Sequence, residues 1–197
     1  DMEAVSKVCP AGAVIPDEKE ETMELNAGSV ILAPGAELMD PDLLTNYGHG
    51  VYPNVVTGLE YERILSASGP TGGLLVRPSD NKKPQKIAWI QCAGSRSKKD
   101  PGVPYCSGVC CMYALKEAMV TKEHFQDDME AVIFFMDMRT SGKDYELYYQ
   151  RAKEDFHVRF ERSRPHSVEP VEGSHDLAIT YMPEDGDLDR TCLLYTS

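Results

Sequence analysis

Four of the six cysteines in this chain lie within a stretch of twenty residues. They are Cys92, Cys106, Cys110 and Cys111, with the spacing C-x13-C-x3-C-C. Cysteine thiolates ligate zinc and iron–sulfur clusters, and they are nucleophiles in thiol–disulfide exchange. Adjacent cysteines argue against a simple disulfide framework, and nothing in the sequence signals export. The dense cysteines therefore indicate metal binding or redox chemistry.

Three kinds of site fit these thiols: an iron–sulfur cluster, a structural zinc ion, and a thiol or disulfide redox site. Zinc sites usually present paired C-x2–4-C knuckles, which this spacing lacks. Adjacent Cys110 and Cys111 are awkward ligands for one small tetrahedral ion, but they can bind separate iron corners of a cluster. The spacing favours the cluster and leaves the other two sites open.

The cysteines are expected to be positioned by alternating strands and helices. Apolar runs predict strands, and 3.6-residue periodicity predicts helices. The order β-α-β-α-β predicts an α/β fold with a Rossmann-like parallel-sheet unit. The predicted elements are strand Ile87–Ile90, helix Cys110–Lys122, strand Ala131–Met136, helix Asp144–Glu154 and strand Val158–Arg162, with a further strand at Leu177–Tyr181.

The loop after the first strand does not carry a nucleotide-binding fingerprint. Its glycines, Gly94, Gly102 and Gly108, do not match the G-x-G-x-x-G spacing that cradles a pyrophosphate. The amino end of the following helix nevertheless offers oriented N–H groups to an anionic cluster. The positive charge of Arg96 and of nearby lysines in the same loop would offset the cluster's charge.

Two features lie upstream. Cys9 precedes Pro10, as the last cysteine of a bacterial-ferredoxin motif does; a buried structural cysteine fits equally well. Residues 28–35, GSVILAPG, predict an apolar strand ending in a tight turn at Gly35. A dinucleotide-binding sheet shows such a turn where the backbone approaches a cofactor, although any buried strand followed by a turn reads the same way.

Composition sets outer limits on function. The net charge of −12 argues against a nucleic-acid-binding surface, and no apolar run approaches the roughly 20 residues of a transmembrane helix.

We expect a fragment of a longer protein, located in the cytoplasm. The predicted domains are residues 1–14, the end of a ferredoxin-like insert; 15–84, part of an FAD-binding domain and a linker; 85–190, the Rossmann-like domain with the cysteines; and 191–197, a tail that need not be native sequence.

The segments QCAGSR and PYCSGVCCMYALKEA resemble the A subunit of heterodisulfide reductase, an iron–sulfur flavoprotein, and its relative in the quinone-interacting oxidoreductase of sulfate reducers. The resemblance extends through VILAPGAELMDP and MDMRTSGKDYELYYQRAKE, over roughly residues 5–182. It implies a thioredoxin-reductase-like flavoprotein with FAD and several [4Fe–4S] clusters, working with other subunits of a redox complex.

The resemblance also implies roles for particular residues. It assigns one cluster to Cys92, Cys106, Cys110 and Cys111, and it makes Cys9 the last cysteine of the ferredoxin-like insert. It places Ala33-Pro34-Gly35 beside the flavin, where the family usually has Ala-Thr-Gly, so a threonine contact is not carried over.

We therefore expect an oxidoreductase component that passes electrons between FAD and iron–sulfur clusters, with this piece inactive by itself. Two alternatives remain: a pyridine-nucleotide-dependent disulfide oxidoreductase with catalytic thiols, and a zinc-stabilised interaction module. Binding of labelled NADH would favour the first, and zinc without iron would favour the second.

Overall fold

In the computed structural model, which describes residues 2–17, 19–35, 37–125, 129–184 and 189–196, the chain divides into two units, Asp1–Glu37 and Leu38–Ser197. The first unit begins with helix α1 (Met2–Val8). Its other described residues form no helix or strand.

The predicted strand over residues 28–35 is therefore wrong. Three apolar side chains in this segment, Val30, Ile31 and Leu32, are 77%, 92% and 85% exposed. A strand must pair its backbone N–H and C=O groups with a neighbouring strand. The described residues of the first unit provide no such neighbour, so apolar composition alone does not produce a strand here.

The second unit is built on a mixed sheet whose strands, as far as the chain is described, follow the order β4-β3-β2-β7-β6-β5. Strands β2, β3 and β4 are parallel, with Trp89 opposite Ile133 and Ile133 opposite Phe160. Strand β7 is parallel to β2, while β6 is antiparallel to β7 and β5 is antiparallel to β6. The strands span β2 Lys86–Ile90, β3 Glu130–Phe134, β4 Arg159–Glu161, β5 Ser167–Pro170, β6 Leu177–Tyr181 and β7 Asp189–Thr196, and β1 (Val55–Val56) pairs with the end of β7.

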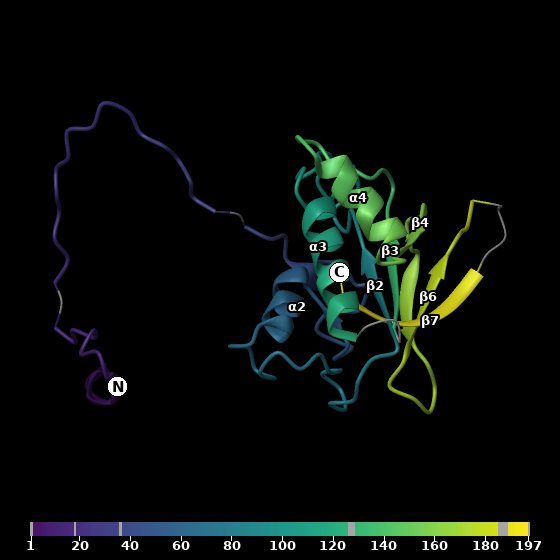
Figure 1. Ribbon diagram of the computed structural model, residues 1–197, viewed down its shortest axis with the longest axis horizontal. Helices are drawn as coiled ribbons and strands as arrows, with labels where there is room; N and C mark the ends of the chain where they lie inside the picture. The colour runs from purple at the N-terminus through teal and green to yellow at the C-terminus, as the bar shows by residue number, and fades with distance from the viewer. Residues whose placement is uncertain (1, 18, 36, 126–128, 185–188, 197) are drawn as a thin grey trace. The chain divides into compact units, whose positions relative to one another are not determined.

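Helices α3 (Cys110–Phe125) and α4 (Tyr145–Glu154) connect the three parallel strands, so the predicted β-α-β-α-β unit is confirmed. Figure 1 shows these helices on one side of the sheet, with α2 (Gly58–Leu65) beside the lower part of α3. A short 3-10 helix, η1 (Pro41–Leu43), precedes them in the chain. No helix in the described ranges is long and apolar enough to cross a membrane.

Strands β2 and β3 are buried on both faces, as their nearly unbroken apolar sequences require. Ile87 and Trp89 of β2 pack with α2 and α3 in one core cluster. Ala88 and Ile90, which alternate with them, belong to a second cluster on the other face, together with Tyr181 and other residues. The period-two alternation of a strand thus divides β2 between two cores.

Candidate metal centre

The predicted ligands follow from the way the sheet and α3 meet. Cys92 lies two residues beyond the end of β2, and Cys110 and Cys111 begin α3. In open α/β sheets, ligands bind outside the carboxyl ends of the strands, where the following helices begin. Asp137, beyond the end of the neighbouring strand β3, lies at the same edge.

The loop between Cys92 and Cys106 folds back on itself. Its two halves are joined by hydrogen bonds from the Val103 N–H to the Gly94 carbonyl, 2.8 Å, and from the Ser97 N–H to the Val103 carbonyl, 2.9 Å. Cys92 has a left-handed φ of 59°, which turns the chain sharply as it leaves the strand. This folding brings Cys106 back toward Cys92, although thirteen positions separate them.

The sulfurs of the four cysteines are close enough to influence one another's ionisation. Burial raises the pKa of Cys92, and charge on Cys110 and on Cys106 raises it further. A hydrogen bond from Cys111 lowers the pKa of Cys110, and that same bond, together with burial, raises the pKa of Cys111. Like-charge repulsion of this kind is what a bound cation or cluster relieves.

Cys106 is half-buried, as is Cys110, whereas Cys92 and Cys111 are buried. The Cys106 sulfur accepts a hydrogen bond from the Gly108 N–H at 3.4 Å. Ser107 donates a hydrogen bond to Cys110, which also receives one from the backbone of Cys92. Donors directed at sulfur stabilise thiolates and tune the potential of iron–sulfur clusters.

The same side chains do not form a site for a single metal ion. Within the described ranges, no group of three or more His, Cys, Asp or Glu side chains is arranged to hold one ion. The thiolates of an iron–sulfur cluster bind separate irons, so they need not converge on one point as the ligands of a single ion do. A donor set of mutually interacting thiols, joined by amide and hydroxyl donors, fits the cluster, and the ligand assignment stays a prediction.

Arg96, Asp137 and Arg162 form an ionic group beside the thiols. Nη2 of Arg96 donates to Oδ2 of Asp137 at 2.7 Å, and Nη2 of Arg162 lies 3.5 Å from Oδ1. Arg96, more than any other group, lowers the pKa of Asp137. The contact of Arg96 with Cys92 opposes the rise in the pKa of that thiol. The Cys111 sulfur also lies 3.9 Å from the Asp137 carbonyl oxygen.

The other predicted site residues lie in the first unit. Backbone N–H groups of Ala13 and Ala11 lower the pKa of Cys9, which is a free thiol. Ala33 and Pro34 are exposed, and Gly35 adopts a left-handed φ of 81° with open space around its Cα. The flavin contact at Ala33-Pro34-Gly35 and the ligand role of Cys9 stay predictions. So do the domain boundaries at residues 14, 84 and 190; Ser197 lies outside the described residues.

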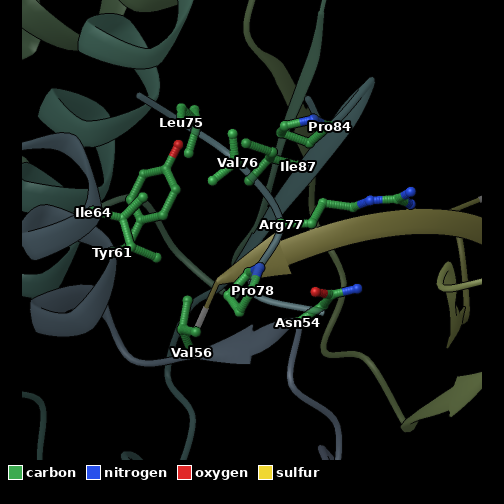
Figure 2. A pocket seen from close by; sticks show the side chains of 10 residues that line it. All are labelled: Asn54, Val56, Tyr61, Ile64, Leu75, Val76, Arg77, Pro78, Pro84 and Ile87. Atoms are coloured by element: carbon green, nitrogen blue, oxygen red, sulfur yellow. The ribbon is translucent and has the colours of Figure 1, made fainter. Parts of the chain in front are cut away.

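A cavity of about 30 Å³ lies away from the cysteines, between α2 and the segment that precedes β2 (Figure 2). Its lining is mainly apolar, with Tyr61 and Ile64 of α2 facing Leu75. Arg77 at its border is bound to Asp80 and Asp176. This volume holds one or two water molecules, so the cavity is a packing gap and not a cofactor site.

The chain is similar to several curated proteins, although no protein-family model matches it. It is 43% identical over 179 residues to the A subunit of the "H(2):CoB-CoM heterodisulfide,ferredoxin reductase" of Methanothermobacter marburgensis, covering 91% of this chain and 26% of that protein. It is 48% identical over 159 residues to the iron-sulfur A subunit of the "CoB--CoM heterodisulfide reductase" of Methanocaldococcus jannaschii, covering 81% and 24%. The chain is homologous to a segment of the heterodisulfide reductase A subunit.

A third relative is the A subunit of the "Ferredoxin/F(420)H(2)-dependent CoB-CoM heterodisulfide reductase" of Methanosarcina acetivorans, 40% identical over 190 residues, covering 87% of this chain and 24% of that protein. The resemblance predicted from the cysteine motif is thereby confirmed. The chain spans about a quarter of the length of the curated relatives it matches.

Proposed function

We propose that this chain is an electron-transfer segment of an iron–sulfur flavoprotein oxidoreductase, of the type found as the A subunit of heterodisulfide reductase. Cys92, Cys106, Cys110 and Cys111 ligate a [4Fe–4S] cluster at the carboxyl edge of the parallel sheet. The observation that carries the proposal is the gathering of these four thiols, from a strand end, a folded loop and a helix start, into one interacting group.

The chemistry of electron transfer belongs to the cofactors, and a bound cluster supplies a one-electron site. The chain's own residues provide thiolates on a scaffold that is rigid on two sides, β2 and α3. The first turn of α3 directs its free N–H groups toward the thiols, which favours negative charge there. Buried side chains of the two core clusters keep this scaffold from relaxing when the charge changes.

The proposal extends to parts that the resemblance implies. Ala33-Pro34-Gly35 would contribute to the site of an FAD that exchanges electrons with the cluster, and Cys9 would ligate a second cluster of ferredoxin type. Other subunits of a heterodisulfide reductase or a related quinone-linked complex supply the acceptor. Free thiols at Cys9 and at the four clustered positions suit the reducing cytoplasm, where we place the protein.

One observation favours a second candidate. The Cys110 thiol has a lowered pKa and lies in hydrogen-bond contact with Cys111, as the thiolate of a redox-active pair does. In that case the chain would belong to a pyridine-nucleotide-dependent disulfide oxidoreductase and would cycle a disulfide without iron.

Anaerobic reconstitution with iron and sulfide separates these functions. We expect about four irons and four acid-labile sulfides per chain, and an EPR signal after reduction with dithionite. Iron-free protein that binds NADH tightly and forms a disulfide would favour the second candidate. Zinc in place of iron would overturn both and indicate a zinc-stabilised interaction module.

A further inference from the structure

Arg96 lies in the loop between Cys92 and Cys106 and has an unusual backbone conformation. Its backbone has a left-handed φ of 56°, a conformation that costs free energy for a residue with a Cβ. Its N–H donates to the Tyr105 carbonyl at 3.1 Å, next to Cys106. The loop thus holds Arg96 between the two cysteines in a backbone conformation that local sequence preference does not favour.

The guanidinium of Arg96 is fixed on one side and has a free donor on the other. Nη2 binds Asp137 at 2.7 Å, and the side chain is only 21% exposed. Nη1 is buried and makes no hydrogen bond in the described part of the chain. Buried polar atoms are almost always hydrogen-bonded, so a buried guanidinium nitrogen without a partner indicates a missing acceptor.

The missing acceptor is expected on the sulfur side. The side chain of Arg96 contacts the Cys92 thiol on that side. Asp137 already satisfies the opposite side of the fork, and Arg162 reaches the other oxygen of the same carboxylate. Asp137 therefore anchors the guanidinium so that its remaining donors are directed away from the carboxylate.

We propose that Arg96 is a positioning residue that sets the reduction potential of the centre, by donating a hydrogen bond and positive charge to the sulfur ligands around Cys92. The inference rests on the proposed function, because it needs a cluster at the four thiols. Reduction adds one negative charge, and a nearby fixed cation with an N–H donor stabilises the reduced form. Arg96 therefore raises the potential.

The neighbouring cations do not have the same role. Lys98 is exposed in the same loop, and bulk solvent and salt screen its charge. Arg162 shares Asp137 with Arg96, but its side chain is 60% exposed and its Nε binds the Met136 carbonyl. Both residues therefore provide matched controls. Replacing Lys98 removes a positive charge from the same loop, and replacing Arg162 removes a bond to Asp137.

The test is an EPR-monitored redox titration of the reconstituted 197-residue chain and its variants. For Arg96→Gln we expect the equilibrium constant for reduction to fall at least tenfold, which is about 59 mV for a one-electron couple. Lys98→Gln and Arg162→Gln should each change it less than threefold. Most of the shift for Arg96→Gln should persist in 0.5 M salt, because salt screens a partly buried contact much less than a charge exposed to solvent.

The results distinguish this inference from the proposed function. Wild-type chain that takes up no iron overturns both. If the wild-type chain holds a full cluster and the Arg96→Gln variant has the same reduction potential, the inference alone is overturned. If Arg96→Gln fails to hold iron, Arg96→Lys decides, because it keeps the charge and loses the fork: a lower potential than wild type supports the role, and an equal potential contradicts it.

Discussion

The indole Nε1 of Trp89 donates a 2.8 Å hydrogen bond to Oε2 of Glu117, which joins the central strand β2 to the middle of α3. Both side chains are almost completely buried, at 1% and 2% exposure. Burial raises the pKa of Glu117 to about 8, and the bond from Trp89 opposes that rise only in part. Glu117 is therefore protonated in the folded protein at neutral pH.

This pairing predicts how stability depends on pH. Between the usual carboxyl pKa of 4.5 and the folded value of about 8, the folded state holds a proton that the unfolded state has released. The contribution of Glu117 to the free energy of unfolding is then largest below pH 4.5 and is lost as the pH rises through 8. The loss is on the order of a few kcal/mol.

Glu117→Gln keeps an acceptor for Trp89 and removes the titration. We expect thermal unfolding of the variant to change less between pH 5 and pH 8 than that of the wild type. Comparing the two proteins at each pH cancels the contributions of all other groups. Equal pH dependence in the two proteins would show that Glu117 is ionised in the folded state.

The burial of Glu117 could not be predicted from the sequence. Helical spacing puts Met112, Leu115, Ala118 and Met119 on one face of α3; the last three are buried and Met112 is partly buried. Spacing of apolar residues does not predict a buried glutamate beside them, because a glutamate next to an apolar stripe is usually solvated. Only the three-dimensional contact with the indole of Trp89 explains why Glu117 lies inside.

Thr121 links α3 to α2 through a buried hydroxyl pair. Tyr61 donates to Thr121 Oγ1 at 2.5 Å, and Thr121 donates to the Glu117 carbonyl at 2.7 Å. Thr121→Val keeps the shape and leaves the tyrosine hydroxyl without this acceptor, so we expect a loss of about 1–3 kcal/mol in the free energy of unfolding. Denaturant titration measures it.

The double variant Thr121→Val/Tyr61→Phe is the control for that measurement. Removing both polar partners restores most of the lost stability, because no buried hydroxyl is then left unpaired. A double variant that loses the sum of the two single effects would contradict the pairing.

Gly94 is constrained in two ways. Its φ of 69° is left-handed, and a Cβ there would overlap the thioether of Met39. Gly72 shares the left-handed φ, 63°, but has open space around it. We expect Gly72→Ala to cost about 1 kcal/mol and Gly94→Ala about 1–2 kcal/mol, because in the latter the flexible end of the Met39 side chain must also move aside.

Thermal unfolding compares the two glycine variants, and Met39→Ala in the Gly94→Ala background should recover part of the difference. Since Gly94 lies in the loop between Cys92 and Cys106, the Gly94→Ala variant should also retain less iron after reconstitution. Equal stability losses at the two glycines would mean that Met39 does not crowd this turn.

The local sequence pattern predicted those helices and strands that carry their own periodicity. It failed where a strand forms only by pairing with a segment distant in the sequence. The strand–helix order from Ile87 to Arg162 was predicted because each element carries its own periodicity. Strand β7 was missed: it lies between β2 and β6, and only long-range pairing makes it a strand. The Arg96–Asp137 bond spans forty-one positions and has no local signal. Residues 28–35 failed for the converse reason, since their composition suits a strand but the described residues of their unit offer no partner.

The iron content of single-cysteine variants is the most direct test of the proposed centre. Cys110→Ala removes one of the four thiols, whereas Cys192→Ala removes the one cysteine that no predicted ligand set includes. After anaerobic reconstitution, wild type and Cys192→Ala should each contain about four irons per chain, and Cys110→Ala should contain clearly fewer. A Cys110→Ala chain with four irons and an unchanged EPR spectrum would contradict the assignment.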